Sequence, residues 1–254
     1  MRPTLSLMRR EFNAYFYSPI AYVVLAVFMA VTGHLFYLSL ALLTARGPKG
    51  ISYPMEMIVN NVSFWLVFLF IPPLLTMRLF AEERSTGTLE MLLTAPIRDW
   101  QVVCAKFVAC YAFYVLMWIP TLFYLPVLLD WQWWTTHCTN DPWAVTSTYL
   151  GLALAGGMFL AIGLLISSMV KSQMVAALIS LWVGLVFIVA GIWRPEMDTS
   201  DIAYRVLFYV TVPLHFERNF GRGLIDTRQI ALYGSVALLC LFLTVRSLES
   251  RRWR

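Results

Sequence analysis

The sequence predicts an all-α membrane protein that crosses the bilayer several times. Of its 254 residues, 60% are hydrophobic and only 13% are charged, whereas soluble domains average nearer 25% charged. The mean hydropathy is +0.71. Six apolar runs alternate with polar segments, and a run of about 20 residues is enough for a helix to cross a hydrocarbon core of about 30 Å.

Residues 1–254 are predicted to form a single transmembrane domain. Prolines, charges and tryptophans mark the ends of its predicted spans. Pro72-Pro73 predicts a kink near the end of the second span, and Pro120 and Pro126 interrupt the third. The predicted spans are 20–43, 57–77, 102–129, 146–170, 174–193 and 229–245.

Residues 1–19 predict an interfacial helix that lies in the headgroup plane. Three arginines supply positive charge along it, and aromatic residues gather before Pro19. A disordered basic leader is the alternative. The apolar residues that fall on one helical face are Leu5, Met8, Phe12 and Tyr15 or Phe16.

The polar interruption at residues 78–100, between the second and third spans, predicts a docking helix at the membrane surface. Gly87 weakens a helix at its own position, and Thr86 and Thr88 can each cap a new one. Pro96 ends that helix. Its apolar face would have to be buried against a partner protein, or against the membrane interface as the alternative. That face consists of Leu89, Leu92 and Leu93, with Glu90 in the first turn.

The external segment at residues 194–228 leaves two predictions open. It carries a short apolar stripe after Ser200-Asp201, and it is too short to cross the bilayer twice. It either dips into the outer leaflet as a re-entrant helical hairpin or forms a surface loop with a small helix.

The fourth span carries small residues at a helical spacing, which lets another helix approach closely. The neighbouring helix belongs either to the same chain or to a second copy. The small residues are Ala153, Gly157 and Ala161.

The distribution of positive charge predicts that both termini are cytoplasmic. In the six-span arrangement, twelve of the nineteen Lys and Arg residues fall on the side of the termini and seven on the other. Cytoplasmic segments carry the excess of positive charge in membrane proteins. We therefore expect a multi-pass protein of the cell membrane, taken here as a bacterial inner membrane.

The sequence lacks the residues that several classes of function require. The stretch Arg46-Gly-Pro-Lys-Gly50 is not a phosphate-binding loop, because the glycine spacing and the following Ser or Thr are missing. No charged residue lies in the middle of a predicted span, which disfavours an ion-coupled carrier. No catalytic set, metal site or cofactor site is predicted, and no basic cluster suggests nucleic-acid binding. A translocation path lined by apolar and hydroxyl groups would suit hydrophobic or amphiphilic cargo.

The stretch Phe80-Ala-Glu-Glu-Arg-Ser-Thr-Gly-Thr-Leu-Glu-Met-Leu-Leu-Thr-Ala-Pro96 resembles the signature of ABC-2 type transporter permeases. Residues 166–177 are similar to the inner turn between spans four and five of that family. Residues 213–227 look like the external segment of its gliding-motility-type and copper-maturation-type branches.

This resemblance implies the membrane subunit of an ATP-driven exporter, without catalysis of its own. It implies a homo- or heterodimer of six-span permease subunits, with a separate ABC ATPase that binds ATP and Mg²⁺. A permease-like subunit that transmits force or signal without moving a substrate is the alternative. The expected ATPase contacts are Glu82, Glu83, Arg84, Gly87, Thr88, Leu89, Glu90, Leu92 and Leu93.

Overall fold

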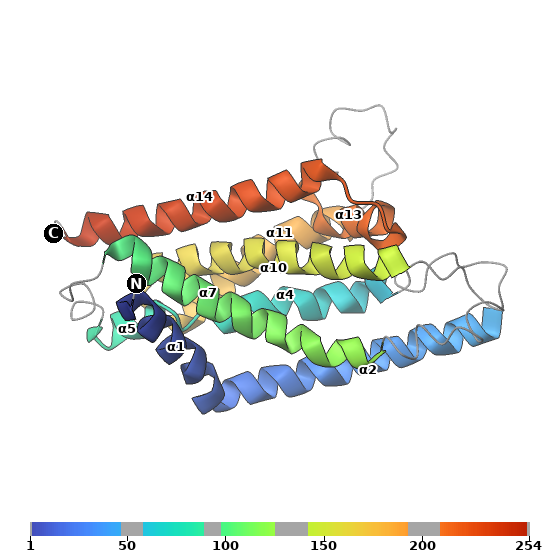
Figure 1. The fold of residues 1–254 in the computed structure, drawn as a ribbon, viewed down its shortest axis with the longest axis horizontal. Coiled ribbons are helices and arrows are strands. Elements are labelled where there is room, and N and C mark those ends of the chain that lie inside the picture. Colours follow the sequence, from blue (N-terminus) through green and yellow to red (C-terminus); the bar gives the residue numbers. More distant parts are fainter. Residues whose placement is uncertain (1, 47–57, 89–97, 125–141, 193–208, 253–254) are drawn as a thin grey trace.

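The computed structural model describes residues 2–46, 58–88, 98–124, 142–192 and 209–252. Every regular element in these ranges is a helix, so the predicted all-α class is confirmed (Figure 1). The elements are α1 (Arg2–Tyr17), α2 (Pro19–Arg46), α4 (Val62–Thr76), α5 (Ala81–Ser85), α7 (Asp99–Trp118), η1 (Ile119–Tyr124), α10 (Pro142–Met169), α11 (Gln173–Ile192), α13 (Val212–Arg218), η2 (Phe220–Arg222) and α14 (Thr227–Arg252).

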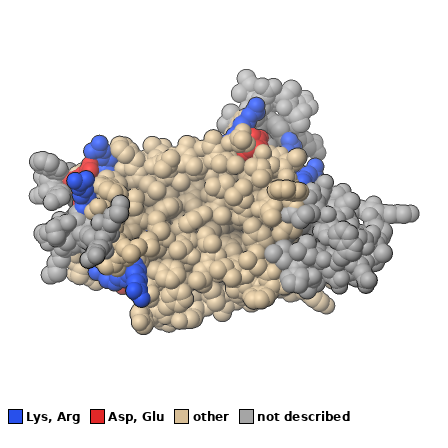
Figure 2. Space-filling view, viewed as in Figure 1, with Lys and Arg blue, Asp and Glu red and all other residues tan. Residues whose placement is uncertain are grey.

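The long helices run side by side as a bundle that suits a bilayer. Four of them contain stretches long and apolar enough to cross a membrane: Pro19–Leu38, Asp99–Phe123, Trp143–Met169 and Thr227–Ser250. Two shorter apolar helices, Val62–Thr76 and Gln173–Val189, lie among them. On the face shown in Figure 2, the charged side chains gather at the two ends, and the broad band between them is uncharged. The chain is therefore a multi-pass membrane protein.

Both chain termini lie at the same end of the bundle, together with α1 and α5 (Figure 1). We call this the terminal end. The opposite end carries α13 and η2, and we call it the α13 end. A shared end for the termini is what an even number of spans requires.

The helix boundaries differ from the predicted ones where a capping residue or a proline intervenes. Helix α4 begins at Val62 rather than at residue 57, because the Asn61 side chain accepts a hydrogen bond from the Ser63 N–H at 3.0 Å. Helix α7 tightens into η1 at Ile119, just before Pro120, which has no N–H to continue the α-helix. Pro126 lies outside the described residues.

Helix α10 lies at the centre, and its glycines let two neighbours pack closely. The Tyr114 hydroxyl of α7 donates to the Leu152 carbonyl of α10 at 2.9 Å. A Cβ on Gly156 would lie 2.2 Å from the Tyr114 ring, and one on Gly163 would lie 2.2 Å from the Thr76 hydroxyl of α4. Neither glycine belongs to the predicted stripe. Of that stripe, Ala153 is half-buried, Gly157 faces the Tyr111 ring of α7, and Ala161 is fully buried.

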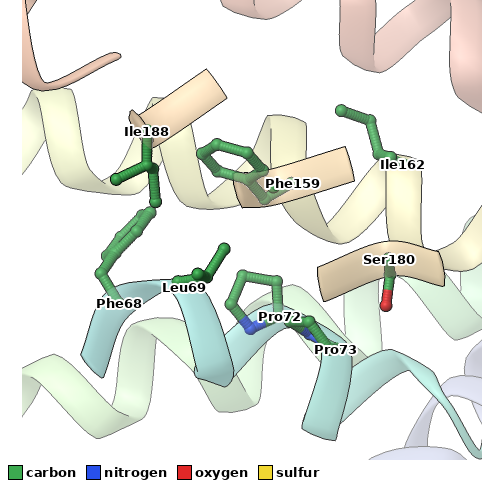
Figure 3. Close-up of a pocket in the computed structure, with 9 residues that line it drawn as sticks. Phe68, Leu69, Pro72, Pro73, Phe159, Ile162, Ser180 and Ile188 are labelled. Atoms are coloured by element: carbon green, nitrogen blue, oxygen red, sulfur yellow. The ribbon is translucent and has the colours of Figure 1, made fainter. Parts of the chain in front are cut away.

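The two consecutive prolines lie within α4, where they pack against α10 and α11 (Figure 3). Pro72 and Pro73 cannot donate to the carbonyls one turn earlier. The Thr76 hydroxyl donates to the Pro72 carbonyl at 2.8 Å. The cavity beside the pair has a volume of about 10 Å³, which is room for one water molecule at most. The helices are therefore closely packed around the pair.

The described part of the external segment is set into the bundle rather than lying on its surface. Phe216 and Phe220 are fully buried, and the Phe216 ring meets the Trp65 ring of α4 edge-on at 5.1 Å. The hydroxyls of Ser147 and Thr148 both donate to the Phe220 carbonyl, at 2.6 and 3.1 Å. A surface loop is therefore the wrong description of α13 and η2. Residues 193–208 lie outside the described ranges.

The N-terminal segment is helical, so the disordered alternative is wrong. Helix α1 packs on α7, where the Tyr15 and Phe113 rings stack at 4.9 Å. The Tyr15 hydroxyl also donates to the Leu75 carbonyl of α4 at 3.0 Å. The face that packs inward includes Leu7, which is buried, whereas Leu5 is 64% exposed.

Replacing Gly156 with Ala should destabilise the bundle. The added methyl group overlaps the Tyr114 ring, and overpacking of this kind costs about 1–3 kcal/mol. Thermal unfolding of the detergent-solubilised protein should show a lower midpoint. Gly234→Ala is the matched control, because no atom lies within 4 Å of its added Cβ. Equal stability of the two variants would contradict the described packing of α7 on α10.

Candidate functional site

At the terminal end, the chain leaves α4 and enters α5 through a turn that α10 holds in place. The Ser167 hydroxyl of α10 accepts hydrogen bonds from the backbone N–H groups of Phe80 and Ala81, at 3.2 and 3.1 Å. Helix α5 has no side-chain cap of its own. Because the first N–H groups of a helix lack partners within it, Ser167 serves as the cap from another helix. Phe80 and Ala81 are buried as a result.

The other end of α5 is tied to the same helix. The Arg84 guanidinium donates to the Met169 carbonyl, at the last residue of α10. A cation at a helix C-terminus satisfies a free carbonyl and favours the helix dipole. Ser167 and Arg84 therefore fix α5 against the final turn of α10.

A buried lysine joins α5 to two further helices. Lys106 of α7 is only 1% exposed, and its ammonium lies 2.7 Å from Glu83 of α5 and 3.1 Å from Glu11 of α1. The same ammonium lies 5.3 Å from the centre of the Phe80 ring, within range of a cation–π contact. We call Lys106, Glu11 and Glu83 the Lys106 junction.

The Lys106 junction lies in apolar surroundings. These strengthen the attraction between its charges, but they also increase the free energy needed to remove those charges from water. Burial raises the pKa of Glu83, and the nearby Lys106 charge only partly opposes that effect. The second oxygen of Glu83, Oε2, is buried without a hydrogen-bond partner in the described part of the chain. Glu11 has a further partner in Arg10, at 2.9 Å. Removing the Lys106 cation would leave two poorly solvated carboxylates close together.

The structure places five of the nine predicted contact residues. Glu82, Gly87 and Thr88 are exposed, while Glu83 and Arg84 are half-buried and engaged as described above. Gly87 has a φ of +73°, the left-handed conformation that favours glycine. The Thr88 hydroxyl lies 2.9 Å from that of Thr86. The other four, Leu89, Glu90, Leu92 and Leu93, lie outside the described residues.

Sequence reasoning missed three residues of this site: Lys106, Glu11 and Ser167. Lys106 is one of the twelve Lys and Arg residues counted on the side of the termini, but it lies seven residues into α7, about 10 Å along the helix axis. A usable signal was present, because one lysine in an apolar run needs an acidic partner, and the polar segments 1–19 and 78–100, predicted on the same side of the membrane, both contain glutamate. Ser167 gave no such signal, since its partners are backbone groups.

No arrangement of His, Cys, Asp and Glu that could hold a metal occurs among the residues with described positions. His137, Cys138 and Asp141 lie outside them. His215 is buried at the α13 end, where its Nδ1 lies 2.8 Å from the Tyr233 hydroxyl.

Replacing Lys106 with Met should lower the free energy of unfolding by about 3 kcal/mol, because loss of one partner leaves buried charge uncompensated. The measurement is thermal or denaturant unfolding in detergent. The triple variant Lys106→Met/Glu11→Gln/Glu83→Gln should regain most of the loss, since no charge then remains in the junction.

Arg246→Met supplies the control for the Lys106 variants. Arg246 pairs with Glu249 on α14, but both side chains are well exposed, and exposed pairs contribute little. A Lys106→Met loss no larger than that of Arg246→Met would show that the junction does not hold the three helices together.

Comparison with known proteins identifies the family of the chain. The family model described as ABC-2 family transporter protein matches residues 52–245, a range that contains α4, α5, α7, α10, α11, α13 and most of α14. No curated protein matches the chain. The match covers well over half of the sequence and includes the segment held by Ser167, Arg84 and Lys106. The chain therefore belongs to the ABC-2 family of transporter proteins, as a permease of an ABC transporter.

Proposed function

We propose that the chain is the membrane subunit of an ABC-2 exporter, which works as a dimer and receives the force of ATP hydrolysis through residues 81–88. The observation that carries this proposal is the attachment of α5 to three helices at once. Ser167 and Arg84 tie it to α10, and the Lys106 junction ties it to α7 and α1.

The attachment makes α5 a suitable receiver of force. Its inward side is fixed by buried contacts, while Glu82, Ser85 and Thr86 are exposed. An ATPase that moves these exposed residues would displace α1, α7 and α10 together. Charges at such a surface set the register of a protein contact more than its affinity, which is the role we assign to Glu82.

The translocation path in this proposal lies between two copies of the chain. Two cavities among the described helices have volumes of only about 10 and 40 Å³, far below the 300–1,000 Å³ typical of ligand sites. The second is lined by hydroxyl and aromatic groups that include Thr32, Thr121 and Tyr149. A path through the centre of one subunit would require these helices to separate. Cargo would be hydrophobic or amphiphilic.

The proposed topology puts the terminal end in the cytoplasm of a bacterial cell, facing the ATPase. ATP and Mg²⁺ would bind to that separate chain, and this chain would hold no cofactor. The excess of Lys and Arg at the terminal end supports this orientation.

Replacing Gly87 with Val should weaken ATPase association. A non-glycine residue in the left-handed conformation costs about 1–2 kcal/mol, which is about a 5- to 30-fold loss in the population of the described turn. No atom lies within 4 Å of the added Cβ, so the effect would be conformational rather than steric. Co-purification of the ATPase and stimulation of its hydrolysis rate are the measurements.

Two further variants sharpen the Gly87 test. Gly87→Asn should retain much of the association, because Asn tolerates this conformation. Gly234→Ala on α14 should behave as the wild type. Normal association and stimulation in Gly87→Val would contradict the proposed contact. Stimulation of the ATPase by the wild type with no movement of amphiphilic cargo would favour force transmission without transport.

The topology can be tested by labelling with an impermeant thiol reagent in intact cells whose native cysteines are replaced by serine. Ser250→Cys, in the last turns of α14, should be protected. Leu224→Cys at the α13 end should react, since this side chain is 61% exposed. Labelling of position 250 together with protection of position 224 would reverse the proposed orientation.

A further inference from the structure

A cleft of about 640 Å³ opens at the terminal end, between the α1–α2 corner and the α4–α5 turn. It is far larger than the two cavities among the helices, and its volume lies in the range of small-molecule sites. Residues of α1, α2, α4 and α5 line it, together with Lys106. The Lys106 junction forms part of its wall.

The wall changes from apolar to charged along the axis of the bundle. Ile20 and Val24 of α2 and Leu74 of α4 line the cleft on the side of the apolar band. Val24 lies five residues into α2, about 7 Å beyond Pro19. Arg78 and Glu82 line it where the chain has left α4. A ligand that fills the cleft would need an apolar tail and a polar head.

Two residues that line this cleft each carry a buried polar atom that lacks a partner in the described part of the chain. One is the Nε of Arg78, a donor, and the other is the Oε2 of Glu83, an acceptor. Buried polar groups in proteins are nearly always hydrogen-bonded, so each calls for a partner. The two atoms are not partners of each other.

Arg78 differs from Lys106 in its neighbours. The Lys106 ammonium lies beside two carboxylates, whereas the Arg78 guanidinium donates to the neutral Ser18 hydroxyl, at 2.8 Å. No carboxylate among the described residues lies within ion-pair distance of Arg78. A guanidinium has five N–H donors and matches the geometry of a phosphate.

The acidic residues of the cleft make a purely anionic ligand a poor fit. Glu11, Glu82 and Glu83 line it beside Arg78 and Lys106, so the wall has no excess of positive charge. A head that carries both a phosphate and a primary ammonium group satisfies both signs. Its ammonium could donate hydrogen bonds to the carboxylates of the exposed Glu82 and the half-buried Glu83.

We propose that this cleft binds one zwitterionic aminophospholipid. The phosphate lies on Arg78, the ammonium lies on Glu82 and Glu83, and an acyl chain lies along Ile20, Val24 and Leu74. The lipid bridges the α1–α2 corner and the α4–α5 turn. It thereby supports the segment that we assign to the ATPase contact, but its binding does not depend on that assignment.

The test is native mass spectrometry of the full chain reconstituted with dioleoyl phosphatidylethanolamine, phosphatidylglycerol and phosphatidylcholine in equal amounts. Wild-type protein should retain one phosphatidylethanolamine per chain, with a preference of about tenfold, because each charge-assisted hydrogen bond that the others lack contributes about that factor. Phosphatidylglycerol has no ammonium, and the quaternary ammonium of phosphatidylcholine has no N–H donor.

Variants on the two sides of the head locate the lipid. Glu82→Gln should reduce the preference to about threefold or less, because it weakens the contact with the ammonium. Arg78→Met should lower the retention of all three lipids about equally, because each of them carries the phosphate. Arg78→Lys should keep part of that retention, and Arg246→Met on α14 should keep both the retention and the preference. Thermal unfolding of each variant shows whether the fold is intact. If Arg78→Met does not fold, Glu82→Gln still decides the test, because residue 82 is exposed.

Three results would overturn the proposal: equal retention of the three lipids by the wild type, an unchanged preference in folded Glu82→Gln, or an equal loss in Arg246→Met. Soluble phosphoethanolamine should not displace the lipid, because it offers nothing to Val24 and Leu74. Displacement at millimolar concentration would show that the cleft recognises the free head rather than a lipid.

Discussion

The structure of the terminal end depends on a single buried charge, the ammonium of Lys106. It comes from α7, inside the bundle, and it can be tolerated there because glutamates from α1 and α5 meet it at 3.1 and 2.7 Å. Buried ion pairs add little net stability compared with apolar packing, but a lone buried charge is costly. The arrangement therefore fixes the relative positions of three helices more than it strengthens the fold.

This constraint explains how a five-residue helix keeps its place. Helix α5 is too short to be stable alone, and its start and end are held by Ser167 and Arg84. The Lys106 junction adds the third attachment, through Glu83. Helix α10 is in turn closely packed against α4, since Gly163 contacts Thr76 at the end of α4. Motion of α5 would thus be passed to α4, α7 and α10 rather than absorbed locally.

The six apolar helices could be predicted from the sequence, because a helix that crosses a bilayer must be apolar along most of its length. Their boundaries differ from the predicted ones where Asn61 caps α4 and where Pro120 interrupts the end of α7. The sequence predicts a break in the helix at Gly87, and its φ of +73° agrees with that prediction. Lys106 and Ser167 could not be placed in the same way, because their partners are distant in sequence. The burial of α13 and η2 depended on Phe216 and Phe220 fitting against α4 and α10, which no periodicity reveals.

We propose that the ATPase acts on the surface of residues 81–88. Photo-crosslinking from a benzoylphenylalanine placed at position 88, in membranes that contain the chain and its ATPase, tests it most directly. The same probe at position 224, at the α13 end, is the reference. We predict a crosslink to the ATPase from position 88 and none from position 224. Crosslinks from position 88 to lipid alone would show that this surface lies against the membrane and not against the ATPase.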